Sequence, residues 1–266
     1  MMERALLGAI AAALVTALAR RMQLLDESGQ WAALACGILA AAAGWPWAIL
    51  LVAYFAAASA VTKMGAARKA ERTRRSVPQI NVRNAFQVAA NGGLFAVLAF
   101  RAGGAPESTY GIAAAGALAA ASADTWATEL GTLWGGRPRS IVNWRLTDPG
   151  MSGGVTLIGT VSGVAGAVLV AVVVALIFGL PLHGKFVGAV IAGGVAGCIA
   201  DSLIGATLQA RRWCAHCKEW TERRVHPCSY RTVHGAGLHW VSNDVVNTAA
   251  TFIGAAAGVV ARRAFG

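Results

Sequence analysis

The stretch TYGIAAAGALAAASADTWATELG, residues 109–131, joins a long run of small apolar residues to two carboxylates, Asp124 and Glu129. Acidic residues are scarce in this chain, which has 12 Asp and Glu among its 266 residues. Asp201 and Asp244 occur in the same apolar setting further along. A carboxylate in hydrocarbon costs about 2.5–3.5 kcal/mol even on lenient insertion scales, so such residues face a polar cavity and have a partner. The stretch therefore predicts a membrane helix with a polar site, for which a divalent cation is the expected partner.

The composition places the chain among integral membrane proteins, because 56% of its residues are hydrophobic and 13% are charged. The 32 glycines permit close helix packing in lipid. We expect an all-α, polytopic helix bundle in which residues 1–266 form a single membrane domain. The net charge is +11, but no nucleic-acid motif accompanies the basic residues. Anionic lipid head groups and phosphates are the expected partners rather than nucleic acid, and the oligomeric state stays open, a homo-oligomer included.

Apolar runs of membrane-helix type recur along the whole chain. A spanning helix needs about 20 apolar residues, so the second run is short, and with Pro46 behind it we expect either a short span or part of one broken helix. The first run is interpreted as a retained helix, since no clear cleavage site follows it. We expect seven or eight spans. The runs cover roughly residues 5–19, 32–43, 46–62, 84–101, 109–126, 155–179, 185–207 and 244–261.

Three loops concentrate Lys and Arg, at about 63–83, 127–154 and 210–240. Short basic loops stay on the cytoplasmic side of a membrane, so all three are expected there. An eight-span topology also places Arg20 and Arg21 inside, and leaves Arg262 and Arg263 outside. The polar residues then lie at the cytoplasmic ends of their helices, in a site that faces the cytosol from the inner membrane.

Asp124 and Thr128 are one helical turn apart and share a face, whereas Glu129 is rotated by about 140° from Asp124. Asp124 is the first choice for a Mg²⁺ ligand, because Mg²⁺ is commonly held by one or two carboxylates together with substrate phosphates. Glu129 is expected to orient a neighbouring Arg or to serve a second metal. A structural salt bridge is the alternative for these carboxylates.

Two later helices repeat the pattern. Asp201 and Gln209 share a face, with Ser202 adjacent, and Asp201 is the second expected Mg²⁺ ligand. Asn243, Asp244 and Asn247 open the last run. We expect Asn243 as the helix N-cap and Asp244 in the positively polarised first turn. For Asp244, an ordinary helix-end carboxylate is an equal alternative.

Amide side chains line the fourth run, where Asn84, Gln87 and Asn91 follow Arg83 with helical spacing. They are expected to bind phosphate or sugar, and the alternative is hydrogen bonding between helices.

A glycine-rich segment, DPGMSGGVTLIGT at residues 148–160, leads into the next long run. Backbone N–H groups at such a helix start form an anion site. Ser152, Gly153, Gly154 and Thr156 are therefore expected to cradle phosphate, and plain helix packing is the alternative.

Three cysteines and a histidine form the pattern Cys214-x2-Cys217-x8-His226-x-Cys228 in the last basic loop. Disulfides are rare in the cytoplasm, whereas four such ligands suit a structural zinc. Cys36 and Cys198 lie in apolar runs and act as small hydrophobic residues.

Taken together, these segments resemble the phytyl-phosphate kinase family, which is related to animal transmembrane protein 19 and to domain of unknown function 92. The resemblance covers about residues 30–250. Each motif is weak, and the ordered set is specific. The segments are RNAFQVAANG at 83–92, ADTWATELG at 123–131, SGGVTLIGT at 152–160, DSLIGATLQ at 201–209 and NDVVN at 243–247.

Plant members of that family phosphorylate an isoprenoid monophosphate to the diphosphate with a nucleoside triphosphate, in the salvage of phytol toward tocopherol. The resemblance implies a kinase for phytyl, geranylgeranyl or farnesyl phosphate that uses CTP or ATP. In this interpretation Asp124 and Asp201 bind Mg²⁺, with Glu129 and Asp244 as second choices. The phosphates lie against Arg83, the three amides and the 152–156 backbone. Arg145 or Arg231 neutralises the transferring group, and the prenyl tail lies between glycine-rich helices, open to lipid.

Two other functions stay open. A transporter or flippase of a polyisoprenoid or phosphorylated lipid also uses intramembrane acids and broken helices. Polar residues at helix ends rather than at the midplane argue against it. A different CTP-dependent or head-group transferase is the third possibility.

Overall fold

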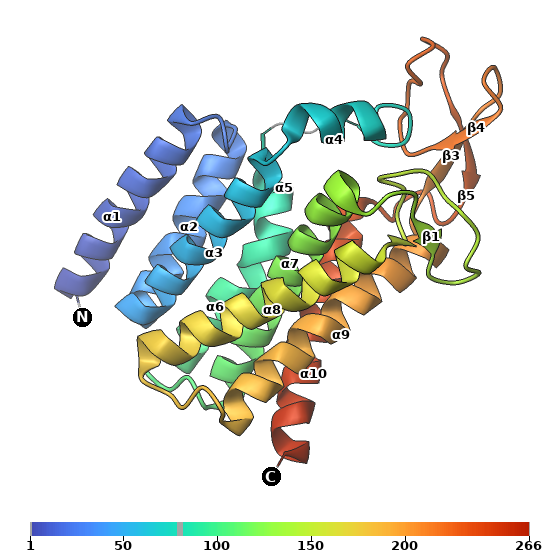
Figure 1. The fold of residues 1–266 in the computed structure, drawn as a ribbon. Coiled ribbons are helices and arrows are strands. Elements are labelled where there is room, and N and C mark those ends of the chain that lie inside the picture. Colours follow the sequence, from blue (N-terminus) through green and yellow to red (C-terminus); the bar gives the residue numbers. More distant parts are fainter. Residues whose placement is uncertain (1, 79–81, 266) are drawn as a thin grey trace.

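The computed structural model describes residues 2–78 and 82–265, and within them long helices run back and forth between two ends of the molecule (Figure 1). Each of the apolar runs falls in one of these helices. They are α1 (Met2–Arg21), α2 (Glu27–Ala43), α3 (Trp45–Lys63), a unit of α5 (Ala85–Val88), η1 (Ala89–Gly93) and α6 (Leu94–Ala102), then α7 (Thr109–Trp134), α8 (Leu157–Phe178), α9 (Lys185–Thr207) and α10 (Asn243–Ala264).

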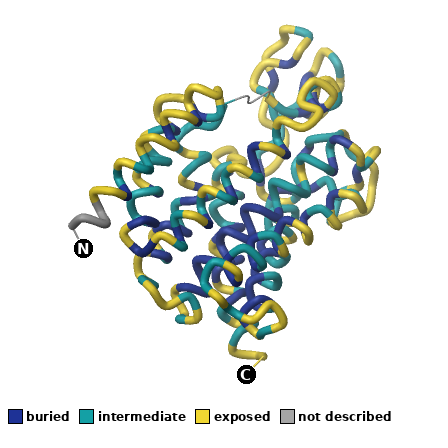
Figure 2. Tube along the Cα trace, turned by 60° about the vertical axis from the view of Figure 1, so that its left-hand side comes forward, coloured by how far each residue is buried: buried dark blue, intermediate teal, exposed yellow. Residues whose placement is uncertain are grey.

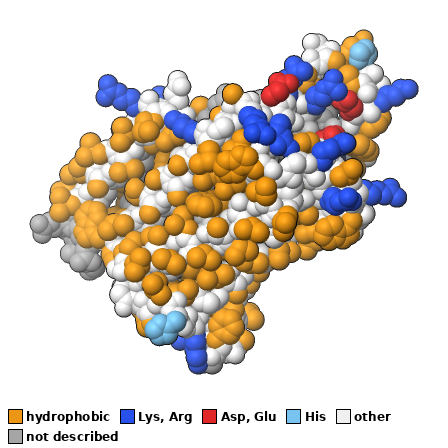
Figure 3. Space-filling model, viewed as in Figure 1, with side chains coloured by type: hydrophobic (Ala, Val, Ile, Leu, Met, Phe, Trp, Pro, Cys, Tyr) orange, Lys and Arg blue, Asp and Glu red, His pale blue; other side chains and the backbone are white. Residues whose placement is uncertain are grey.

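Within the described residues, five helices are long and apolar enough to cross a membrane. They are α3, the unit at 85–102, α8, α9 and α10. The protein is thus a polytopic, mostly helical membrane protein. Figure 3 shows a hydrophobic flank over these helices, with Lys and Arg gathered mainly at the end that carries α4 (Ala66–Thr73) and the strands. We call this end the loop face; its described residues are 22–26, 64–78, 82–84, 135–156 and 208–242.

The second apolar run does not join the third in one broken helix. Asp26 caps α2 by accepting a hydrogen bond from the Gly29 amide at 2.7 Å. Gly44 then turns the chain with a φ of 149°, a value that favours glycine. Pro46 lies in the first turn of α3, where a missing N–H costs nothing.

Helix α7 forms the centre of the bundle and packs against α3, α6, α8, α9 and α10. Its residues 111–123 are all buried. Figure 2 shows the buried residues gathered in the interior of the bundle. Glycine allows the neighbouring helices to approach closely: a Cβ on Gly197 of α9 would lie 2.4 Å from the Ala120 Cβ and 2.8 Å from the Ala250 carbonyl oxygen. The small residues of the opening stretch therefore determine how tightly the helices around it pack.

Two departures from regular helix were not foreseen. Residues 89–93 form a π-helical turn, and the Thr251 hydroxyl of α10 donates to the Ala90 carbonyl there at 3.3 Å. Such turns are frequent at functional sites. The loop face also contains small antiparallel sheets, so the fold is mostly rather than purely helical. One pairs β1 (Arg139–Ser140) with β2 (Gly154–Val155); the other orders β4 (Glu219–Thr221), β3 (Arg211–Cys214) and β5 (Val233–Ala236).

Candidate functional site

A cavity of about 450 Å³ opens among α7, α8, α9 and the glycine-rich segment. Asp124 and Asp201 line it, and their carboxyl groups lie within hydrogen-bonding reach of each other. Thr128 lies next to Asp124 on α7, as the spacing predicted. No Lys or Arg of the described residues lines this cavity. Two carboxylates that share a cavity without a cation from the described residues could act as ligands to a metal ion.

The third acidic helix also reaches this pair. With its amide nitrogen facing α9, Asn247 donates to Asp201 Oδ1 at 3.0 Å and to the Asn243 carbonyl at 3.2 Å. Asn243 and Ser202 line the same cavity. Helices α7, α9 and α10 thus bring together the polar residues that the sequence indicated on each of them.

Glu129 does not share the Asp124 cavity. Its carboxylate pairs with the Lys69 ammonium of α4. That ammonium also donates to the Val61 and Thr62 carbonyls at the end of α3, at 3.0 and 2.7 Å. Glu129 therefore forms a salt bridge, which was the alternative for these carboxylates, and its partner is a buried Lys rather than the expected Arg. Lys69 lies in the basic loop at 63–83, and nothing in its local sequence marks it as buried.

A second cavity of about 810 Å³ lies beside the first and opens on the loop face. Thr128 and Asn243 line both cavities, so the two are adjacent. Its charged residues come from five separate segments of the chain. They are Lys63, Lys69, Arg212 and Arg224, with Glu129, Glu222 and Asp244.

Asp244 lies in the first turn of α10 and faces this second cavity. The expected N-cap, Asn243, is instead the first helical residue. Ser242 caps α10, because its hydroxyl accepts from the Val245 amide at 3.4 Å. The shift by one residue frees Asn243 to face both cavities.

The glycine-rich segment lies against the carboxylate cavity, where Ser152, Gly153, Gly154 and Thr156 form part of the wall. Gly153 has a φ of 79°, and a Cβ there would lie 2.6 Å from the Ala206 Cα, so only glycine fits. The Thr156 hydroxyl caps α8 by accepting from the Gly159 amide at 3.0 Å.

The predicted phosphate cradle of this segment is only partly available. The Ser152 amide donates to Glu222 Oε1 at 2.9 Å, and the Gly154 amide donates to the Met151 carbonyl at 3.1 Å. These N–H groups are directed to protein acceptors rather than to a ligand. The segment therefore shapes the wall more than it supplies donors.

Glu222 was not singled out in the sequence, where it precedes Arg223 and Arg224 in an ordinary basic loop. It joins three segments: besides the Ser152 amide it accepts from Gln209 Nε2 at 2.9 Å, and Arg211 lies nearby and donates to the Ser152 carbonyl at 2.9 Å. Burial raises the pKa of Glu222, and the hydrogen bonds from Ser152, the Arg211 charge and the Gln209 hydrogen bond oppose that rise. Gln209, expected at a ligand, holds this carboxylate instead.

The amides that follow Arg83 are engaged at the start of their own helix. Asn84 and Gln87 form a capping box, in which each side-chain oxygen accepts from the other's backbone amide at 3.1 Å. Asn91 donates to the Gln87 carbonyl at 2.9 Å, across the π-helical turn. Asn84 still lines the second cavity, and Gln87 lines both that cavity and a third, apolar one.

The two arginines expected to neutralise the transferring group lie elsewhere. Arg145 and Arg231 are exposed on loops, and neither lines the three cavities described here. Arg139 donates to the Trp144 carbonyl at 2.8 Å, which shapes the hairpin turn that carries Arg145 outward. Arg212 and Arg224 line the second cavity.

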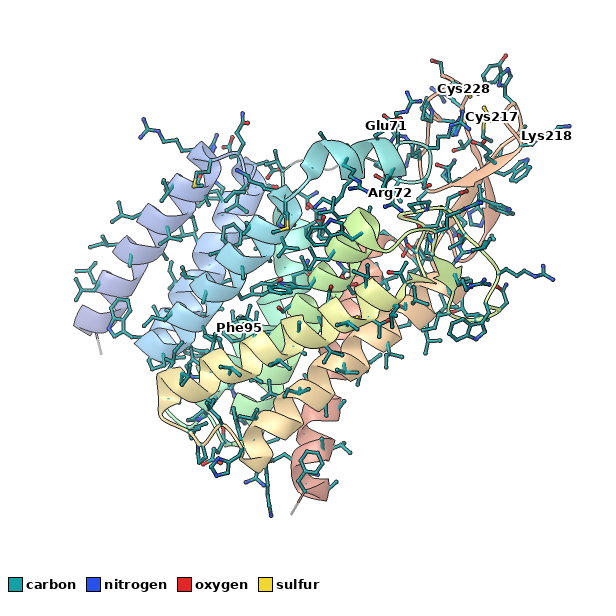
Figure 4. The ribbon with its side chains drawn as sticks, in the orientation of Figure 1. Glu71, Arg72, Phe95, Cys217, Lys218 and Cys228 are labelled. Carbon is teal, nitrogen blue, oxygen red and sulfur yellow. The ribbon has the colours of Figure 1, made fainter. Side chains whose placement is uncertain are left out.

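Cys214, Cys217, His226 and Cys228 converge as predicted, with their ligand atoms all within 4.8 Å of one another. Figure 4 shows Cys217 and Cys228 of this cluster at the end of the molecule that carries the strands. The Cys214 and Cys228 sulfurs are 3.7 Å apart. A tetrahedral zinc site with Zn–S bonds of about 2.3 Å places its sulfurs about 3.8 Å apart. The cluster can therefore hold a metal such as zinc.

The histidine of this cluster has a partner behind it. His226 Nδ1 lies 3.1 Å from the Cys228 sulfur, and its Nε2 lies 3.5 Å from Glu219 Oε2. His226 Nε2 and Glu219 Oε2 are both buried, and neither makes a hydrogen bond within the described residues. A carboxylate behind a histidine is the usual orienting partner of a metal ligand, because it fixes the tautomer that leaves the other nitrogen free to bind.

Long apolar helices that carry polar residues at one end define an integral membrane protein of the polytopic class. Over residues 10–255 the chain matches the model of the family described as integral membrane protein DUF92, and it belongs to that family. An uncharacterized membrane protein of Methanocaldococcus jannaschii is 30% identical over 125 residues, which cover 46% of this chain and 49% of that protein. The match thus spans about half the length of that relative. No solved structure matches the chain.

Proposed function

We propose that this protein is a membrane-embedded kinase that transfers the γ-phosphoryl group of CTP or ATP to a prenyl monophosphate. The observation that carries the proposal is the Asp124–Asp201 pair, which faces a cavity without a cation from the described residues. The resemblance to the phytyl-phosphate kinase family supplies the reaction, with phytyl, geranylgeranyl or farnesyl phosphate as acceptor.

The topology we propose has eight spans, with the loop face in the cytosol. It adds α1, α2 and α7 to the five apolar helices, since α7 is enclosed by its neighbours and α1 packs along α2. Most Lys and Arg of the described residues lie on the loop face, in keeping with the positive-inside rule. Nucleotide from the cytosol then reaches both polar cavities.

Asp124 and Asp201 would hold Mg²⁺ together with substrate phosphates. When bound there, the ion would supply positive charge to offset the negative charge of the transferring phosphoryl group. Thr128, Ser202 and Asn247 surround the pair and orient it, the last through its hydrogen bond to Asp201. Lys63, Arg212 and Arg224 at the second cavity supply the positive charge that nucleotide phosphates require.

The acceptor is a phosphate oxygen that is already anionic at neutral pH, so the site needs no strong general base. This oxygen forms a bond to the γ-phosphorus while the bond from that phosphorus to the β–γ bridging oxygen breaks. The nucleoside diphosphate leaves with that oxygen and its electron pair. The protein contributes alignment and charge neutralisation, which its carboxylate pair and basic residues provide.

The Cys₃His cluster would hold a structural zinc. It lies outside the two polar cavities, and all four ligand positions are filled by protein, which is the arrangement of a closed structural site. The same loop supplies Glu222 to the glycine-rich segment, so zinc would stabilise the wall of the carboxylate cavity from outside.

The test is transfer of labelled γ-phosphate from ATP and CTP to phytyl and geranylgeranyl monophosphate by purified protein in detergent, with and without Mg²⁺. Diphosphate that forms only with Mg²⁺ and protein supports the kinase. Folded protein that forms no diphosphate from any prenyl phosphate contradicts it, and movement of the same lipids across proteoliposomes would then identify a transporter.

A further inference from the structure

The third cavity, of about 420 Å³, lies between α1, α2, α3 and the start of the α5–α6 unit. Its walls are mostly alanine, glycine and branched aliphatic side chains. Val15, Ile49 and Val52 line it and are also 38%, 52% and 43% exposed, so the cavity has an apolar opening on the flank of the bundle. On a membrane helix bundle such an opening faces lipid.

One end of this cavity is polar. Arg83, Gln87, Asn91 and Thr125 line it. In the described part of the chain, no carboxylate oxygen lies within 4.0 Å of the Arg83 guanidinium. Its described side-chain partners are two long hydrogen bonds, to Ser59 Oγ at 3.4 Å and Thr62 Oγ1 at 3.5 Å, and the Phe55 ring at 5.4 Å. A guanidinium without an anion, at the end of an apolar cavity, is a site for an anionic group.

The backbone of Arg83 is held firmly at this position. Its amide donates to the Leu24 carbonyl at 3.1 Å, and its carbonyl accepts from the Asp26 amide at 3.1 Å. A Cβ on Gly29 would lie 2.2 Å from that carbonyl oxygen, so α2 packs directly on the segment. The corner between α1 and α2 therefore fixes the backbone of Arg83 beside the polar end of the cavity.

The polar end adjoins the proposed reaction site. Gln87 lines both this cavity and the second one, where nucleotide phosphates are proposed to bind. Thr125 lines the apolar cavity, and its neighbour Asp124 lines the carboxylate cavity. Gln87 of α5 thus lies between this cavity and the second one, and consecutive residues of α7 line this cavity and the carboxylate cavity.

We propose that this cavity binds one hydrocarbon chain of a phosphorylated lipid, with the phosphate on Arg83 and the chain directed between α1, α2 and α3 to the lipid opening. The volume lies in the range of about 300–1,000 Å³ that is typical of sites for a single small ligand. The binding stands on the cavity and on Arg83 alone; its role as the acceptor subsite rests on the proposed kinase function.

The test is equilibrium binding of geranylgeranyl monophosphate to the full-length protein in detergent, without nucleotide or Mg²⁺. Geranylgeraniol and inorganic phosphate are the two comparison ligands, because the first has the hydrocarbon chain without the phosphate and the second has the phosphate without the chain. The account expects the monophosphate to bind at least about tenfold more tightly than either, since charge-assisted hydrogen bonds to Arg are lost with one and chain burial with the other.

Two variant pairs locate the binding. Ala53→Phe fills the cavity and should weaken binding at least about tenfold, whereas Ala56→Phe, on an exposed position of α3 outside the cavity, should not change it. Arg83→Gln should weaken binding of the monophosphate and leave binding of geranylgeraniol unchanged. Arg68→Gln, at an exposed position, is the control. Thermal unfolding of each variant shows whether it is folded.

A photoreactive group at the end of the prenyl chain gives a readout that needs no substitution. Crosslinks to α1, α2 or α3 support the cavity, and crosslinks confined to other helices overturn it. Equal binding by Ala53→Phe and wild type also overturns it. If binding follows this pattern but no phosphoryl transfer occurs, the proposed lipid site stands and the proposed kinase function fails. If phosphoryl transfer occurs and is insensitive to Ala53→Phe, the kinase function stands and the proposed lipid site fails.

Discussion

Asp124 of α7 and Asp201 of α9 place their carboxyl groups within hydrogen-bonding reach of each other at the wall of one cavity. Two like charges this close are stable together only if they share a proton or a cation. Substitutions at this pair can therefore test the expected metal and the proposed chemistry separately from the fold.

Mg²⁺ should stabilise the wild-type protein through this pair, and Asp201→Asn should abolish the effect. Without Mg²⁺ the variant should be at least as stable as wild type, since the substitution removes one of two facing charges. Thermal unfolding in detergent with and without Mg²⁺ measures both. Glu107→Gln, on an exposed loop at the opposite end, is the matched control. Equal Mg²⁺ stabilisation of Asp201→Asn and wild type would remove the metal assignment.

Lys69 and Glu129 should depend on each other for stability. Glu129→Gln leaves the Lys69 charge buried with only the carbonyls of α3 as partners, which should cost about 3 kcal/mol. Lys69→Met should cost a similar amount, and the double variant less than the sum. The measurement is a double-mutant cycle in denaturant; strictly additive losses would show that the two side chains do not interact.

Zinc should bind in one equivalent per chain at the Cys₃His cluster. Cys214→Ser should lose the metal, whereas Cys36→Ser, on α2 and outside the cluster, should keep it. Glu219→Gln should weaken binding by about 10- to 100-fold, because it removes the partner that orients His226. Metal analysis of purified protein decides this, and a full equivalent in Cys214→Ser would refute the ligand set.

Glu222 should make stability depend on pH. Burial raises the pKa of its carboxyl group above the ordinary 4.5, so the folded state holds a proton that the unfolded state has lost. The resulting stability is fully present below about pH 4.5 and declines as pH rises through the folded pKa. Glu222→Gln lacks this decline. As pH rises across that range, the melting temperature of the variant should therefore increase relative to that of wild type. A difference between the two proteins that is constant from pH 4 to 8 would contradict this.

Much of this fold can be predicted from the sequence, because each membrane helix must be apolar along its own length. The runs at 5–19 through 244–261 all became helices, and Asp124, Asp201 and Asn247 could be expected to meet because polar residues in lipid seek one another. The Cys214–Cys228 spacing likewise marks its metal cluster directly.

What could not be predicted depends on partners distant in the chain. Lys69 looks like any loop lysine until α4 folds across α7, and Glu222 becomes buried only when the loop after β4 reaches Ser152. The π-helical turn at 89–93 follows from packing against α10, where Thr251 takes the Ala90 carbonyl. Arg145 and Arg231 were expected at the site, and the loops that hold them place both outside it.

The most direct measurement is the initial rate of γ-phosphate transfer to geranylgeranyl monophosphate as a function of Mg²⁺, in wild type and in Asp124→Asn shown to be folded. The account predicts Mg²⁺-dependent diphosphate formation by wild type and a loss of about 10²-fold or more in the variant, since the carboxylate acts through charge stabilisation at the transferring group. Full transfer by Asp124→Asn would contradict it.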